Sequence, residues 1–81
     1  MKFDKSRVYT AVNADELKVG SKCIFADTVK SLKEIVQYDD AGDYVETFYG
    51  LYDDLDDVRF WGESYCYTYA YLIDPPAEPK Y

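Results

Sequence analysis

The sequence predicts a small single domain of the α+β class, with one helix packed on a mainly antiparallel sheet of about four strands. Four stretches are rich in β-branched and aromatic residues, which favour strands. One stretch has apolar residues at helical spacing, and clusters of Gly, Asp and Pro separate these stretches. The chain has 81 residues, of which 48% are hydrophobic. Its length fits one domain, and its hydrophobic share places it outside the disordered class.

The first two strands are predicted at residues 7–12 and 22–26, which have the sequences RVYTAV and KCIFA. Between them, Asn13 is predicted to be an N-cap residue, and Glu16 follows three residues later, a pattern typical of a helix start. Gly20 comes soon afterwards. We therefore expect one helical turn or a turn motif between the two strands.

The helix is predicted at residues 28–37, where Asp27 and Thr28 act as capping residues. Apolar residues recur at helical spacing along one face, and Lys, Glu and Gln fill the other face. The apolar residues are Val29, Leu32, Ile35 and Val36. The sequence DDAGD at 39–43 ends the helix, because Gly and Asp favour turns.

Two further strands are predicted after the helix, which gives the element order β-β-α-β-β. The third covers residues 44–49 and extends towards Tyr52. A turn or loop follows at 53–57, because four aspartates in five residues oppose strand pairing. The last strand covers 58–73. It bends at Gly62 and ends before Pro75 and Pro76, which cannot donate to a strand ladder. Flexible ends are expected at 1–6 and 75–81.

The negative charge of the chain is concentrated in one segment. Residues 38–63 contain nine acidic residues and one basic residue, Arg59, and so carry −8, whereas the whole chain carries −7. The acidic residues are Asp39, Asp40, Asp43, Glu46, Asp53, Asp54, Asp56, Asp57 and Glu63. Aromatic residues lie between them. Charge of this density repels nucleic acid and favours a partner with a basic surface.

The composition argues against catalysis. The chain has no histidine, the commonest general base and metal ligand, and its four glycines are isolated, so no phosphate loop is present. The acidic runs lack the ligand spacing of a calcium loop. We therefore expect a non-catalytic protein with no cofactor and no metal site.

The cysteines and the N-terminal sequence indicate a cytoplasmic protein. Cys23 and Cys66 are the only cysteines, too few for a disulfide scaffold, and we expect both thiols to be reduced. The chain starts with MKFDK, which is not a secretory signal. No apolar run is long enough to span a membrane.

The first functional hypothesis is a small acidic accessory protein that acts by binding another protein. Its charge array would imitate the phosphates of nucleic acid and inhibit a basic nucleic-acid-handling protein. Tyr49 and Tyr52 would act as anchors within this array. The proposed charged contacts are Asp39, Asp40, Asp43, Asp53, Asp54, Asp56 and Asp57. The competing interpretation is that the acidic run is only a solvated turn that aids solubility.

The second hypothesis is a structural or self-associating module. Tyr65, Tyr67, Tyr69 and Tyr71 alternate with smaller residues, so the four tyrosines would share one face of a strand. This face would cover the open side of the sheet or, if uncovered, form a homodimer contact. Stacking of nucleic-acid bases on these tyrosines is disfavoured, because Arg59 is the only basic residue in 58–73 and such sites need Lys or Arg to bind phosphates.

The run TAVNADELKVGSK at residues 10–22, followed by FADT at 25–28 and Leu32-Lys33, carries a resemblance. It resembles small uncharacterised proteins of phages and mobile elements of Gram-positive gut bacteria. The resemblance covers about residues 8–37. It implies a bacterial or phage setting, where small acidic proteins can inhibit host nucleases. It implies no activity and no functional residues.

Overall fold

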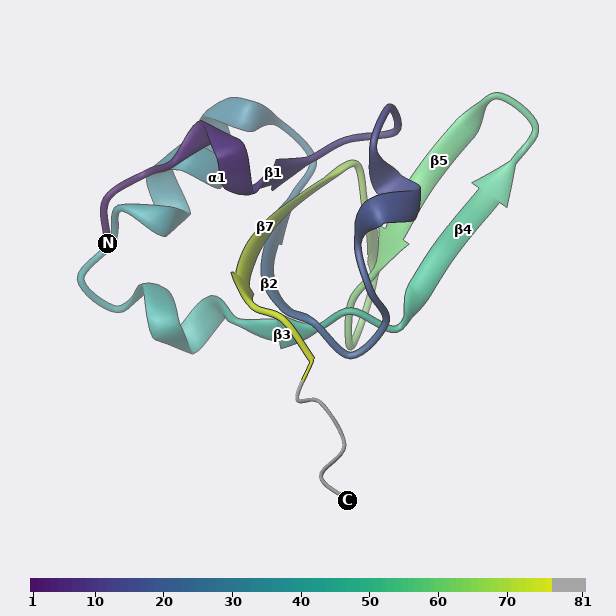
Figure 1. Cartoon of the computed structure of the whole chain (residues 1–81). Coiled ribbons are helices and arrows are strands. Elements are labelled where there is room, and N and C mark those ends of the chain that lie inside the picture. Colours follow the sequence, from purple (N-terminus) through teal and green to yellow (C-terminus); the bar gives the residue numbers. More distant parts are fainter. Residues whose placement is uncertain (77–81) are drawn as a thin grey trace, which may run out of the picture.

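Strand β2 (Lys22–Ala26) has a neighbour on each edge, and the rest of the fold is arranged around it. It pairs antiparallel with β7 (Tyr69–Asp74) and with β3 (Glu46–Thr47). β1 (Val8–Tyr9) pairs with the outer edge of β7, so the strand order is β1-β7-β2-β3. The computed structural model describes residues 1–76, without the side chain of Asp54 (Figure 1).

A second antiparallel sheet has the order β4-β5-β6. Its strands are β4 (Gly50–Asp54), β5 (Asp57–Trp61) and β6 (Cys66–Tyr67). The chain passes between the sheets twice. After β3, the Phe48 amide donates to Ser21 O at 2.8 Å and the Tyr49 amide donates to Trp61 O at 2.9 Å. Between β6 and β7 the chain bends at Thr68. The two sheets are therefore joined at two corners.

Alternate side chains of β2 enter two different cores. Cys23 and Phe25 belong to a core shared with the second sheet, whereas Ile24 and Ala26 pack with the helix. The first core contains Ala14, Leu17, Cys23, Phe25, Phe48, Phe60 and Ala70. The second contains Ile24, Ala26, Leu32, Val36, Ala41 and Tyr71. Both faces of the four-stranded sheet are thus covered, which explains the nearly continuous burial of β2.

The predicted α+β class is confirmed, with α1 (Val29–Val36) on one face of an antiparallel sheet. Thr28 caps this helix: its hydroxyl oxygen accepts from the Ser31 amide at 3.1 Å. Leu32 and Val36 are buried, but Val29 of the predicted stripe is exposed. The second sheet was not predicted. Residues 1–76 also contain three short 3-10 helices: η1 (Lys5–Arg7), η2 (Ala14–Glu16) and η3 (Ala41–Tyr44).

The turn or loop predicted over 53–57 is a turn of two residues, and the strands on either side of it are longer than predicted. Asp53, Asp54 and Asp57 lie in paired strands, and only Leu55 and Asp56 form the turn. Strand propensity is overridden because this end of the hairpin lies in water, where the carboxylates of Asp53, Asp56 and Asp57 stay solvated. The predicted continuous strand over 58–73 was wrong, since it is divided into β5, β6 and β7.

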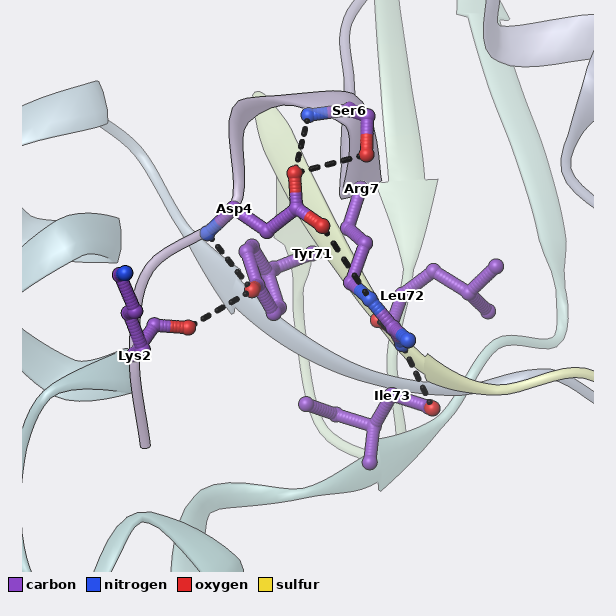
Figure 2. Close-up of polar contacts among 7 residues, drawn as sticks. All are labelled: Lys2, Asp4, Ser6, Arg7, Tyr71, Leu72 and Ile73. Carbon is purple, nitrogen blue, oxygen red and sulfur yellow. Dashed lines mark hydrogen bonds and ion pairs between the residues drawn. The ribbon is translucent and has the colours of Figure 1, made fainter.

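The N-terminal segment 1–7 packs on β7 and α1. The ring of Phe3 stacks on Tyr71 with centroids 5.4 Å apart, and the N-terminal amine donates to Val36 O at 2.9 Å. Figure 2 shows the Tyr71 hydroxyl accepting from the Asp4 amide at 3.0 Å and donating to Lys2 O at 3.4 Å. The flexibility predicted for residues 1–6 stays a prediction. Of the predicted flexible end at 75–81, residues 77–81 lie outside the described residues.

Asn13 does not cap the 3-10 helix η2. Its side-chain oxygen instead accepts from the Thr10 amide at 2.8 Å, so it closes the turn that precedes the helix. The helical turn or turn motif predicted between the first two strands is confirmed, but the capping role assigned to Asn13 was wrong.

Candidate binding surface

The β4–β5 hairpin projects from the body of the molecule (Figure 1). Its register pairs Gly50 with Trp61 and Asp54 with Asp57. Of the five paired positions in the hairpin, only the inward side of β5 contacts the core, and the rest of the ladder extends beyond the core. Phe60 is fully buried and Val58 packs at the edge of the first core. The distal half of the hairpin therefore lies in solvent.

The outward face of the hairpin carries two aromatic side chains. Tyr52 and Trp61 are diagonal neighbours in the ladder, with ring centroids 6.1 Å apart and planes at 83°. This edge-to-face arrangement is favourable for aromatic pairs. Tyr52 is 43% exposed and Trp61 is 41% exposed. Tyr49 lies at the base of the hairpin and is also exposed. The face thus offers rigid aromatic area to a partner.

The charge of the hairpin is only partly compensated. Arg59 Nε donates to Asp57 Oδ2 at 2.8 Å, and this hydrogen bond raises the pKa of Arg59 above its ordinary value. Asp53 and Asp56 are exposed, and neither forms an ion pair with any residue that the structure describes. With Asp54, the hairpin carries four aspartates and one arginine.

Leu55 occupies the tip of the hairpin in an unusual conformation. Its side chain is 97% exposed, and its φ of +50° lies in the left-handed region. This region is disfavoured for a branched side chain, and Gly, Asn or Asp is usual there. The turn therefore holds an apolar side chain in water at a conformational cost, beside Asp56.

The remaining predicted charges lie elsewhere. Asp39, Asp40 and Asp43 lie in and before η3, after the helix. In Figure 1 this teal helical turn and the tip of the β4–β5 hairpin lie on opposite sides of the molecule. The structure therefore brings together Tyr52, Asp53, Asp54, Asp56 and Asp57, and it does not bring the first three aspartates to them.

Glu46 and Glu63 have local roles at the corner between the sheets. Glu46 Oε1 accepts from the Glu63 amide at 2.9 Å, and Glu63 Oε2 accepts from the Thr47 amide at 2.9 Å. These two carboxylates hold the turn after β5 against β3. Glu46 and Glu63 belong to the acidic segment 38–63 in the sequence, but neither lies in the hairpin.

The single tyrosine face predicted at 65–71 does not exist. The bend at Thr68 reverses the alternation, so Tyr67 packs on the first core while Tyr69 and Tyr71 pack with the helix. Tyr71 is 1% exposed, and only Tyr65 is largely exposed, at 68%. The small residue Ala70 faces the second sheet, not the helix. A contact made by all four tyrosines is therefore excluded.

The contacts and the pKa of Tyr67 also indicate that its side chain is partly buried. Its ring stacks on Phe25 at 5.6 Å. Partial burial raises the pKa of the Tyr67 hydroxyl, and the carboxylates of Glu46 and Asp27 raise it further.

Sequence reasoning missed three hairpin residues: Leu55, Arg59 and Trp61. A hairpin centred on residues 55 and 56 would have found Trp61, because alternation from Asp57 places residues 57, 59 and 61 on one face. The clustered aspartates obscured that centre.

The described residues show few features suited to chemistry. Cys23 and Cys66 are free, and burial raises the pKa of Cys23 to about 12, so this thiol is not a nucleophile at neutral pH. Within residues 1–76 no three His, Cys, Asp or Glu side chains are grouped as metal ligands. In the same range no helix is long and apolar enough to cross a membrane. Comparisons of the chain with protein-family models, curated proteins and solved structures found no match.

Proposed function

We propose that this protein is a small, non-catalytic accessory protein that binds another protein through the β4–β5 hairpin. The observation that supports this is the combination on one projecting hairpin of the Tyr52–Trp61 pair, the exposed Leu55 and unpaired carboxylates. Aromatic side chains supply much of the binding energy of protein interfaces. The carboxylates select a basic partner and accelerate its association.

The conformation of Leu55 also favours a binding role. A leucine that is exposed and left-handed costs stability in the free protein. Backbone strain of this kind is found preferentially at functional positions. A partner that covers Leu55 would remove its exposed apolar surface from water, which is favourable.

The finer proposal is that the partner is a nucleic-acid-handling protein whose basic groove accepts the hairpin in place of phosphates. The carboxylates of the hairpin, the length of its two paired strands and the overall charge of −7 support this choice. The resemblance of residues 8–37 to phage and mobile-element proteins gives such a partner a setting. The aspartates around η3 would have at most a secondary, long-range effect.

The test is affinity capture from bacterial lysate with charge-matched variants. The hairpin variant is Asp53→Asn/Asp56→Asn, and the control is Asp39→Asn/Asp43→Asn, which removes the same charge from the other end. We expect the native chain and the control to retain the same basic protein, identified by mass spectrometry and released by salt. The hairpin variant should lose it. Equal retention by all three chains, or retention of no basic protein, would remove the proposal.

A further inference from the structure

A cavity of about 600 Å³ lies at the N-terminal segment. In Figure 1 this segment and the hairpin tip lie on opposite sides of the molecule. It is lined by residues 1–5, Arg7 and Tyr71. This volume falls within the range of sites that bind small groups or side chains. Its apolar wall is the ring of Phe3, which stacks on the buried ring of Tyr71. Figure 2 shows how Tyr71 holds the backbone of Lys2 and Asp4, which fixes this wall.

The cavity is a positive region on an acidic protein. Lys2, Lys5 and Arg7 line it against one carboxylate, that of Asp4. That carboxylate is occupied: it accepts from the Ser6 amide at 3.0 Å and from the Ser6 hydroxyl at 2.7 Å, and it lies 3.9 Å from Arg7 Nε. The Ser6 hydrogen bonds lower the pKa of Asp4, so it remains charged and engaged with them.

Arg7 is also held in place, since it donates to Leu72 O and Ile73 O at 3.2 Å each (Figure 2). The ammonium groups of Lys2 and Lys5 form no ion pair with any of residues 1–76. The cavity therefore presents two uncompensated cations beside an aromatic wall. A complementary occupant is an apolar side chain flanked by carboxylates.

We propose that this cavity receives the tip of the β4–β5 hairpin from a second copy of the chain, so that copies join head to tail. Leu55 packs against the ring of Phe3, and the carboxylates of Asp53 and Asp56 lie beside Lys2 and Lys5. The tip is the part of the described chain that combines an apolar side chain exposed at 97% with flanking free carboxylates. The inference rests on the proposed function, because it names one basic surface that the hairpin binds.

The geometry determines the kind of assembly. The two surfaces differ, and the segments that carry them lie on opposite sides of one molecule (Figure 1). The contact is therefore heterologous, and each added copy leaves both surfaces available at the ends. The centres of two joined chains, each of charge −7, are separated by a distance comparable with the 40 Å length of the molecule. At about 0.15 M salt the screening length is about 8 Å, so the repulsion between the net charges is largely screened and the attraction at the contact outweighs it.

Sedimentation velocity over a concentration series tests this proposal. Three chains are compared: native, the hairpin variant Asp53→Asn/Asp56→Asn and a cavity variant Lys2→Gln/Lys5→Gln. All four positions are exposed, so both variants should keep the native circular dichroism. Asp39→Asn/Asp43→Asn and Lys30→Gln/Lys33→Gln are charge-matched controls at exposed positions away from the contact.

We expect the native chain and both controls to sediment faster as concentration rises at about 0.15 M salt, and as monomers at about 1 M salt, where screening reaches about 3 Å. Each contact variant alone should remain monomeric. An equimolar mixture should stop at a dimer, because it contains one intact hairpin and one intact cavity. A native chain that is monomeric throughout, assembly that survives in either variant, or a mixture that does not dimerise would overturn the proposal.

The two proposals fail separately. The Lys2→Gln/Lys5→Gln variant keeps the hairpin intact, so it should still capture a basic lysate protein. A monomeric native chain with intact capture therefore removes only the head-to-tail contact. If the chain assembles but captures no basic protein, the proposed binding of a different protein fails and the head-to-tail contact between copies remains.

Discussion

Tyr71 is a buried side chain with two hydrogen bonds, and its place in the sequence indicated neither. Replacing it with Phe keeps the ring against Phe3 and the helix but leaves the Asp4 amide and Lys2 O without their partner. We expect Tyr71→Phe to lower the free energy of unfolding by about 1 kcal/mol. Urea denaturation measures this. The matched control, Tyr65→Phe at an exposed position, should change it by less than about 0.5 kcal/mol. Equal effects would contradict the assigned hydrogen bonds.

Gly62 is required by the space around it. A Cβ there would lie 2.9 Å from Glu46 Oε1 and 3.3 Å from the Phe25 ring. Phe25 is in the core, and Glu46 Oε1 accepts from the Glu63 amide, so neither moves freely. We expect Gly62→Ala to cost about 1–3 kcal/mol in thermal or chemical denaturation. Gly42→Ala is the control, since nothing lies within 4 Å of its Cβ position. Similar effects of the two substitutions would contradict the close packing described around Gly62.

Among single elements, the hairpin turn links stability and binding. Asn tolerates the left-handed conformation better than Leu. We expect Leu55→Asn to raise the free energy of unfolding by about 1 kcal/mol and to weaken capture of the basic partner. Val12→Asn is a matched control at a residue 93% exposed with no positive φ, and it should alter neither quantity. A destabilised Leu55→Asn variant, or one with unchanged capture, would contradict the role given to the tip.

The elements also show how far the sequence leads. The second strand and the helix were predicted to within about one residue, because each is a short apolar pattern between clear breaks. The hairpin was placed only roughly. Its aspartates opposed strand formation locally, and pairing with β5, which is anchored in the core by the buried Phe60, decided the outcome. The break at Thr68 likewise depends on two sheets meeting, which no local pattern reports.

The candidate site was predicted in part. Tyr52 and the aspartates 53–57 lie together as expected, but Asp39, Asp40 and Asp43 do not join them. The sequence shows charge density along the chain, whereas the folded chain turns the two acidic groups to opposite sides. The cavity beside Lys2 and Lys5 was not predicted, since it depends on Tyr71 reaching across from β7.

At the scale of the whole molecule, Cys23 makes the free energy of unfolding depend on pH in the alkaline range. Burial raises its pKa from 9.0 to about 12 in the folded chain. Between these values the folded state keeps the thiol proton while the unfolded state releases it, so stability falls as pH rises through this window. We expect the native chain to lose stability more steeply than Cys23→Ala from about pH 9 to about pH 12. Parallel pH curves in urea denaturation would show that Cys23 is accessible to water.

The most direct test of the hairpin as the binding surface uses its own fluorophore. Trp61 is the only tryptophan and lies beside Tyr52 on the outward face. We would titrate the native chain, Asp53→Asn/Asp56→Asn and Asp39→Asn/Asp43→Asn with oligolysine, a basic probe, and record Trp61 emission. The hairpin account predicts a salt-sensitive change that is equal in the native chain and the second variant, and several-fold weaker in the first. An equal change in all three chains, or none at low salt, would contradict it.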